Sequence, residues 1–411
     1  MSEIGTFYRS ASGYVAVRDE GGIQVEISRL KRRSDGLQGE VVVSAAVVPR
    51  LGGRLHEAMF NISSTVARDR LVKTLVERSR PEAFPWDELI EEFCSRVLEA
   101  ERQGTPVVTL GNGLHRTGEL MLVDPLLVDY KPTICFAQGG TGKSYLAVLL
   151  SVAVSSGIDV MGWSTKRSGK VLYLDWEADA EEVDMRVRRV ANGLGVKPPN
   201  ILYRSMSRPL DDSADQIART VEAEGVILVV VDSVGIASGS AREHSDASET
   251  AIRLFSAFRL LGCAVLAIDH VTGEDARNHN GAIAKPYGSI YKVNLARSVW
   301  ELRGTNDEHG DTHLALYHRK VNAGRLHDAI GLRVEHTNDA TLFQPEEVDD
   351  PSLVSGLTQS ARIERVLRDG AATAAAIATE TGLTPSAVRV VLGRGSGSLF
   401  TKNADGTWEN S

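Results

Sequence analysis

The sequence has few cysteines and no long apolar segment, and each shortage excludes a class of protein. Its three cysteines, Cys94, Cys135 and Cys263, are far apart, which argues against a disulfide framework or a zinc site and favours a reducing compartment. No apolar run approaches the ~20 residues that span a bilayer. The first residues, MSEIGTFYRS, lack a basic segment followed by an apolar one, so a secretory signal is not expected. We therefore expect a cytoplasmic protein without a membrane partner.

The sequence also lacks an excess of positive charge. The formal net charge is −8, with 42% hydrophobic and 24% charged residues, as in a globular protein. This charge argues against a chain coated with basic patches, but a ring-shaped protein can keep its basic groups in a channel, so nucleic-acid binding stays open. A length of 411 residues predicts two or three domains.

The first predicted domain covers residues 1–115. Short alternating runs, YVAVR, IQVEISRL and EVVVSAAVV, predict strands joined by Gly/Asp turns. Two helices are expected after them, SSTVARDRLVKTLVERS with a serine cap and WDELIEEFCSRVLEAERQG ending at a glycine. We predict a small α+β module of unknown role, and we find no catalytic or ligand-binding motif in its sequence.

The second predicted domain covers residues 116–350. Five nearly continuous apolar runs, TICFAQ, KVLYLDW, NILYRS, VILVVVD and CAVLAIDHV, are typical of parallel strands covered on both faces. Helical segments lie between them. Three later runs, SVWELR, THLALYHRK and GLRVEHT, are expected to pair antiparallel. The pattern predicts an α/β domain.

The third predicted domain covers residues 356–411, after the linker-like stretch DDPSLVSGLTQS. The segments ARIERVLRDG, TAAAIATETG and TPSAVRVVLGRG predict three short helices, and SLFTKNADGTWEN predicts a hairpin. Three helices and a hairpin suggest a winged helix-turn-helix. Its recognition helix would be TPSAVRVVLGRG, with Arg389, Arg394 and Lys402 near DNA; winged helices also dock proteins, so both uses stay open.

A phosphate-binding loop is the strongest motif in the chain. AQGGTGKS follows an apolar strand and opens a helix, which is the context that a Walker A motif requires. Its glycines let backbone N–H groups face phosphate oxygens at the start of the helix. Lys143 is expected to reach the β- and γ-phosphates of ATP, and Ser144 to ligate Mg²⁺. The predicted nucleotide-binding residues are Ala137, Gln138, Gly139, Gly140, Thr141, Gly142, Lys143, Ser144 and Tyr145.

The sequence has no glutamate where many nucleotide hydrolases carry their catalytic base. The run VILVVVDSVG ends in Asp232, a candidate Mg²⁺ ligand, and the next residue is Ser233. One strand earlier, KVLYLDWEADAEE offers Glu177, which could hold the attacking water if its strand ends beside the phosphate loop. Alternatively, Glu177 and the acids after it are simply the favourable first turn of a helix.

The order AQGGTGKS, VLYLDWE, VVVDS, LAIDH resembles the RecA-like ATPases, and most of all the RepA-type hexameric replicative helicases. The resemblance covers about residues 116–335. It implies a RecA-like core, Glu177 as the catalytic glutamate and Asp232 as an unaccompanied aspartate at the Mg²⁺ site. His270, in LAIDH, resembles the histidine with which this family senses the γ-phosphate, although a capping or core histidine is the alternative.

The segment LYHRKVNAGR resembles the family's K-x-N-x-G region, which supplies basic residues to the nucleotide of a neighbouring subunit. The candidates are Arg319, Lys320 and Arg325. Strand alternation puts Arg319 and Lys320 on opposite faces, so at most one is expected to reach the nucleotide. Lys320 is preferred because it occupies the motif's lysine position; solvated charges at a strand end are the alternative.

Two polar loops, GIASGSAREHSDAS and TGEDARNHNGAIAKPYG, occupy the positions that face the central channel in RecA-like rings. Arg242, Arg277 and Lys285 are candidate phosphate contacts, and Tyr287 is a candidate for stacking on a base. The loops also carry acids, so ordinary solvated loops remain the alternative.

These observations favour an ATP-dependent motor on single-stranded DNA, a RepA-like hexameric helicase that uses ATP and Mg²⁺ and works with replication proteins. Two alternatives remain. One is a recombinase-like or loader ATPase that remodels DNA or a partner without unwinding. The other is a DNA-binding regulator in which ATP only switches conformation.

Overall fold

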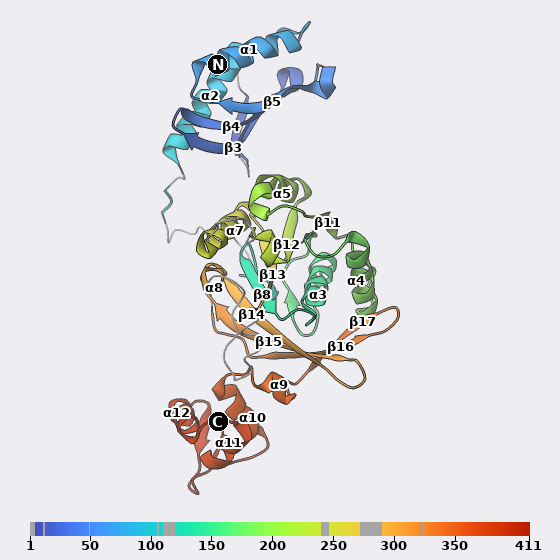
Figure 1. The fold of residues 1–411 in the computed structure, drawn as a ribbon, viewed down its shortest axis with the longest axis vertical. Helices are drawn as coiled ribbons and strands as arrows, with labels where there is room; N and C mark the ends of the chain where they lie inside the picture. The colour runs from blue at the N-terminus through green and yellow to red at the C-terminus, as the bar shows by residue number, and fades with distance from the viewer. Residues whose placement is uncertain are drawn as a thin grey trace. The chain divides into compact units, whose positions relative to one another are not determined.

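The computed structural model describes residues 5–10, 13–48, 50–104, 107–109, 120–239, 246–271, 290–322 and 324–411. Figure 1 shows the order of the elements along the chain, and contacts between Cα atoms divide the chain into two compact units. The first contains residues 1–119, 210–226 and 256–262, and the second contains residues 120–209, 227–255 and 263–411. The predicted boundary near residue 115 lies outside the described residues, and the predicted division into three domains stays a prediction.

A five-stranded antiparallel sheet forms the N-terminal part of the first unit, in the order β1-β2-β3-β4-β5. The three predicted runs are β2, β3 and β4, while β1 and β5 are edge strands that the sequence analysis missed. The strands are β1 (Thr6–Arg9), β2 (Gly13–Arg18), β3 (Ile23–Arg33), β4 (Gly36–Ala45) and β5 (Arg54–Asn61).

Period-2 alternation gives this sheet one buried face. Every second residue of β4 is buried, and the pair Ile27↔Val41 stands across β3 and β4. Two helices pack against that face, α1 (Thr65–Arg78) and α2 (Trp86–Gln103). Ser64 caps α1 by accepting from the N–H of Ala67, and Gly104 ends α2, as the sequence predicted.

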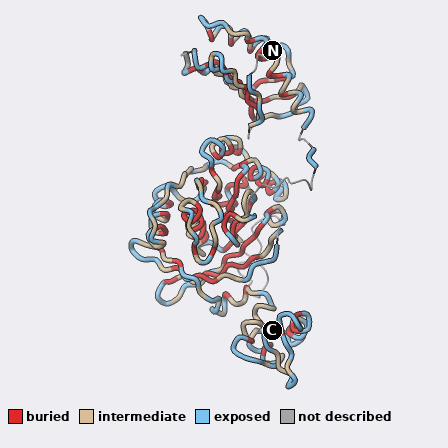
Figure 2. Tube along the Cα trace, turned by 180° about the vertical axis from the view of Figure 1, so that it is seen from behind, coloured by how far each residue is buried: buried red, intermediate tan, exposed pale blue. Residues whose placement is uncertain are grey.

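The second unit is built on a nine-stranded sheet in the order β11-β10-β12-β13-β8-β14-β15-β16-β17. Strands β8, β12 and β13 are almost wholly buried, as Figure 2 shows, because helices and loops cover both faces. The strands are β8 (Pro132–Ala137), β10 (Lys170–Asp175), β11 (Leu202–Ser205), β12 (Val226–Asp232), β13 (Ala264–His270), β14 (Ser298–Asn306), β15 (Thr312–Val321), β16 (Ile330–His336) and β17 (Thr341–Glu346).

The expectation for the later strands is wrong in one place. Strand β14 pairs parallel with β8, with Val299 opposite Ile134, and only its other edge pairs antiparallel with β15. Its first five residues, from Ser298 to Leu302, are buried like those of a central strand. The antiparallel part of the sheet therefore begins one strand later than expected. Strand β17 was not predicted.

Helices connect these strands, and the central apolar cluster lies between the sheet and the helices α3 and α4. The helices are α3 (Lys143–Ser156), α4 (Ala180–Gly193), α5 (Leu210–Glu224), α6 (Val234–Ala237), α7 (Ala247–Leu261), α8 (Ile290–Leu295) and α9 (Pro351–Val354). A small unpredicted sheet, β7-β6-β9, joins β6 (Met121–Asp124), β7 (Leu127–Val128) and β9 (Ser164–Thr165).

The C-terminal residues form three helices and a hairpin with a hydrophobic cluster of their own, centred on Ile363, Leu392 and Phe400. The elements are α10 (Gln359–Arg368), α11 (Ala374–Thr381), α12 (Pro385–Gly395), β18 (Phe400–Lys402) and β19 (Trp408–Asn410). Threonine side chains cap all three helices. The predicted elements are present; their assignment as a winged helix-turn-helix stays a prediction.

No helix in the described ranges is long and apolar enough to cross a membrane.

Candidate nucleotide-binding site

The phosphate loop connects β8 to α3, as the Walker A motif requires. Gly140 and Gly142 have φ of 75° and 94°, a left-handed conformation that explains the glycines. Lys143 begins α3 and is only 5% exposed. Its Nζ donates to the carbonyl oxygens of Ala137 (3.2 Å) and Gln138 (2.8 Å). Burial lowers the pKa of Lys143, while nearby negative groups such as Asp232 oppose that shift.

Asp232 ends β12 beside this loop. Its Oδ2 accepts the hydroxyl of Tyr173 at 2.7 Å, and its carboxylate also interacts with the hydroxyl of Ser144. Burial raises the pKa of Asp232, and the hydrogen bonds from Tyr173 and Ser144 oppose that shift. A hydroxyl and a carboxylate side by side are hard oxygen donors of the kind that Mg²⁺ takes together with phosphate oxygens. The two residues predicted as metal ligands therefore fit that ion.

Glu177 lies in the turn after β10, outside the following helix. Helix α4 begins at Ala180, and its N-cap is Asp179, which accepts from the N–H of Glu182 at 2.9 Å. The acids of the first turn are Glu181 and Glu182. The alternative explanation, favourable first-turn charge, therefore applies to the acids after Glu177 and not to Glu177 itself.

The backbone at Glu177 is tied to the Asp232 strand. Strand β10 is separated from β8 by β12 and β13, so it does not end directly beside the phosphate loop. However, the N–H of Trp176 donates to the carbonyl of Asp232 at 2.7 Å, and the N–H of Glu177 donates to Asp175 Oδ1 at 2.9 Å. These bonds turn the chain across the strand ends and bring Glu177 to the same cavity as Lys143.

Two further side chains contact Glu177. Ser233 Oγ donates to Glu177 Oε1, and His270 Nε2 lies 3.2 Å from the same oxygen. His270 ends β13, which is parallel to β12 and β8. Parallel strands present their carboxyl ends at one edge, so Asp232, His270 and the phosphate loop meet there.

A cavity of about 300 Å³ contains these groups. On the side away from Asp232, only Tyr145 was predicted as a lining residue. Its ring centre lies 4.7 Å from that of His336 and 5.5 Å from the guanidinium carbon of Arg186. Arg186 comes from α4 and His336 from β16, and no local motif marks either residue. The lining residues are Gly140, Thr141, Gly142, Lys143, Ser144, Tyr145, Glu177, Arg186, Asp232, His270, Thr312, Leu314, Val334 and His336.

Lys320, the preferred candidate for acting on a neighbouring subunit, contacts groups of its own chain, and its role between subunits stays a prediction. Its Nζ donates to the carbonyls of Val293, Asn294 and Ala296 at 2.7–2.8 Å, which satisfies the C-terminal end of α8. Arg319 is engaged as well, with Nε 2.6 Å from Glu301 Oε2. Arg325 is exposed, and no hydrogen bond or ion pair to it is found among the described residues.

The predicted DNA contacts divide into two groups. Arg242, Arg277, Lys285 and Tyr287 lie outside the described residues. Arg389 and Arg394 are exposed on α12, and Lys402 is exposed on β18 with its Nζ 5.8 Å from the ring centre of Trp408.

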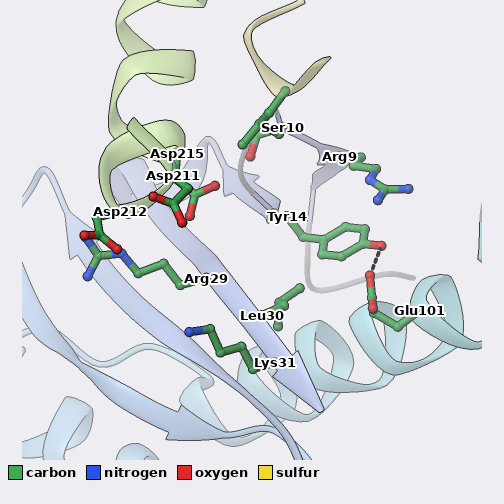
Figure 3. Close-up of a pocket in the computed structure, with 12 residues that line it drawn as sticks. Arg9, Ser10, Tyr14, Arg29, Leu30, Lys31, Glu101, Asp211, Asp212 and Asp215 are labelled. Atoms are coloured by element: carbon green, nitrogen blue, oxygen red, sulfur yellow. Dashed lines mark hydrogen bonds between the residues drawn. The ribbon is translucent and has the colours of Figure 1, made fainter. Parts of the chain in front are cut away.

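A larger hollow of about 570 Å³ lies within the first unit (Figure 3). Basic side chains from β1 and β3 and aspartates from α5 line it, and Tyr14 donates to Glu101 at 2.8 Å. Because charges of both signs line the hollow and the phosphate loop is elsewhere, it does not resemble a nucleotide site. The charged lining residues are Arg9, Arg29, Lys31, Glu101, Asp211, Asp212 and Asp215.

Comparison with known proteins agrees with this geometry. Residues 104–276, somewhat less than half of the chain, match the AAA domain family. This range contains the phosphate loop, Glu177, Asp232 and His270, so the match supports a P-loop ATPase domain in this segment, while its RecA-like assignment stays a prediction. ATP and usually Mg²⁺ are the ligands that such a domain implies, whereas the RepA-type branch stays a prediction. No curated protein matches the chain.

Among solved structures, the KaiC-like protein of the hyperthermophilic archaeon Pyrococcus horikoshii OT3 is similar to this chain. The similarity covers 55% of this chain and 94% of that protein, at 16% identity and a TM-score of 0.39. A similarity at this level does not bear on function.

Proposed function

We propose that this protein is a motor that hydrolyses Mg-ATP on single-stranded DNA, as a ring with its active sites at subunit boundaries. The observation that carries the hydrolytic part is the convergence of Lys143, Asp232, Glu177 and His270 on one cavity. A site that only bound nucleotide would need no second carboxylate, such as that of Glu177 after β10, beside Asp232 of β12. The DNA motor and the ring rest on the order of the sequence motifs.

The residues have distinct parts in the proposed reaction. The phosphate loop and Lys143 bind the phosphates of ATP. Glu177 accepts a proton from a water molecule while the water oxygen attacks the γ-phosphorus. The bond between the γ-phosphorus and the β,γ-bridging oxygen breaks, giving ADP and phosphate. Ser144 and Asp232 would hold Mg²⁺, which would supply positive charge to neutralise the β- and γ-phosphates. In this proposal His270, which contacts Glu177, responds to the γ-phosphate.

Arg325 is our proposed contact with the nucleotide of the neighbouring subunit. Lys320 and Arg319 already bind groups of their own chain, whereas Arg325 is exposed beyond β15. A guanidinium supplied across a boundary stabilises the charge that develops on the transferring phosphoryl group. An arginine acting in this way would leave a single subunit with an incomplete site.

ATP hydrolysis by the purified protein, with and without single-stranded DNA, tests the proposal. We expect stimulation by DNA in the wild type and a loss of hydrolysis, with ATP binding retained, in Glu177→Gln. Size measurement with an ATP analogue tests the ring, and a monomer with full activity would refute it. Mixing Arg325→Ala with Glu177→Gln subunits should restore part of the activity if Arg325 acts across a boundary.

A strand-displacement assay separates a helicase from a loader or recombinase-like ATPase, which would hydrolyse ATP on DNA without unwinding it. An ATP-switched regulator predicts very slow turnover and sequence-selective binding through Arg389 and Arg394.

A further inference from the structure

The Ser233 hydroxyl contacts Glu177 and not its own helix. Ser233 precedes α6 as the N-cap residue, a position where serine usually accepts from the first turn of the helix. Here its side chain makes no cap hydrogen bond, and its Oγ donates to Glu177 Oε1 instead. The residue is 1% exposed, so its hydroxyl is held in one place by the surrounding packing.

Glu177 needs such a contact because its side chain projects into an open cavity. Its side chain is 42% exposed, and a free glutamate side chain samples many rotamers, so fixing it in one conformation costs entropy. Its backbone is already fixed through Trp176 and Asp175. Ser233 and His270 fix the remaining freedom at Oε1.

The second carboxylate oxygen is left for another partner. Of the residues that the structure describes, none forms a hydrogen bond with Glu177 Oε2. A base whose one oxygen is held by Ser233 and His270, and whose other oxygen has no partner among the described residues, is arranged to take a proton from water at that second oxygen.

We propose that Ser233 is the positioning residue of the catalytic base, orienting Glu177 from the strand end where other hydrolases carry the base itself. This inference rests on the proposed function. It explains why serine follows Asp232: the position after the aspartate still serves the base, through a hydrogen bond across the two neighbouring strands.

Steady-state ATP hydrolysis by the full chain tests the inference. We expect Ser233→Ala to lower kcat about tenfold, with the KM for ATP changed less than about twofold, because a misplaced base affects the chemical step and not nucleotide binding. Ser233→Thr keeps the hydroxyl and should retain most of the activity. Ser238→Ala is the matched control, since Ser238 is also buried beside α6 but donates to Gly235.

A double variant separates positioning from a general structural effect. In the Glu177→Gln background, Ser233→Ala should lower the residual rate no further, because the group that it orients is already disabled. A further drop of similar size, an unchanged or raised kcat in Ser233→Ala, or a change in KM alone would overturn the assignment. Thermal melting of each variant identifies any loss of activity that comes from misfolding. If Ser233→Ala is misfolded, the activity of Ser233→Thr decides whether the hydroxyl matters.

The two proposals fail in different ways. If the wild type does not hydrolyse ATP, or Glu177→Gln remains active, the proposed function and the role of Ser233 both fall. If Glu177→Gln is inactive while Ser233→Ala keeps the wild-type kcat, only the role of Ser233 falls.

Discussion

Two lysines in this chain place their ammonium groups among backbone carbonyl oxygens, and their surroundings differ. Lys143 donates to two carbonyls at the start of the phosphate loop and lines the cavity. Lys320 donates to three carbonyls at the end of α8. The first can exchange its partners for phosphate oxygens, whereas the second completes a helix end. The role of a motif lysine therefore depends on the groups that its ammonium already binds.

The largest expected effect comes from the cavity lysine. Lys143→Ala should lower ATP hydrolysis by on the order of 10³-fold and weaken binding of an ATP analogue, because it removes the positive charge that stabilises the phosphates. Melting temperature without nucleotide should change little. Unchanged ATP binding in this variant would mean that Lys143 has a structural role, as we propose for Lys320.

The next largest effect concerns the buried ion pair that joins α8 to β13. Lys292 Nζ lies 2.9 Å from Asp269 Oδ2, and the two side chains are 6% and 0% exposed. Lys292→Met leaves the Asp269 carboxylate buried without its partner, so we expect a loss of about 3–5 kcal/mol in the free energy of unfolding. Urea unfolding measures it. Asp269→Asn combined with Lys292→Met should recover part of the loss.

Lys320→Met gives a smaller and more informative effect. Removing the cap of α8 should lower the free energy of unfolding by about 1–3 kcal/mol, measured by urea unfolding. ATP analogue binding should remain. Arg325→Ala is the contrast: we expect unchanged unfolding and a lower ATPase rate in the assembled protein. The reverse pattern, a stable but inactive Lys320→Met, would restore Lys320 as the residue that acts between subunits.

The smallest expected effect is a pH dependence away from both lysines. His313 Nδ1 lies 2.8 Å from Glu346 Oε1 and its Nε2 lies 3.2 Å from Asp307 Oδ2. The hydrogen bond with Glu346, and to a lesser extent Asp307, raises the pKa of His313 above 6.5, against the effect of burial. Its stabilisation is therefore fully present below pH 6.5 and is lost as the pH rises through the raised value. The melting temperature, measured at several pH values across that range, should fall as the pH rises, and His313→Gln should reduce this fall.

The sequence predicted what depends on local pattern. The phosphate loop, the buried strands and the capped helices were found because periodicity, glycine positions and capping residues act over short distances. Glu177 was predicted from its position after the preceding strand and then from a family resemblance, and the structure brings it to the cavity by the bond from Trp176 to Asp232.

The missed features depend on contacts between distant segments. The parallel pairing of β14 with β8 follows from burial that its own pattern does not reveal. The partners of Lys320 come from α8, and those of Glu177 from two other strands. Arg186 and His336 likewise join the cavity from separate elements. No spacing rule within the sequence marks such meetings.

The three cysteines have a practical consequence for watching this protein work. All are buried, and burial raises the pKa of Cys94, Cys135 and Cys263 to about 12, so little thiolate is present at neutral pH. A thiol-reactive fluorophore should therefore leave the native chain almost unlabelled. One cysteine introduced at an exposed position would take the dye selectively, which gives a single-site optical reporter without first removing the natural thiols.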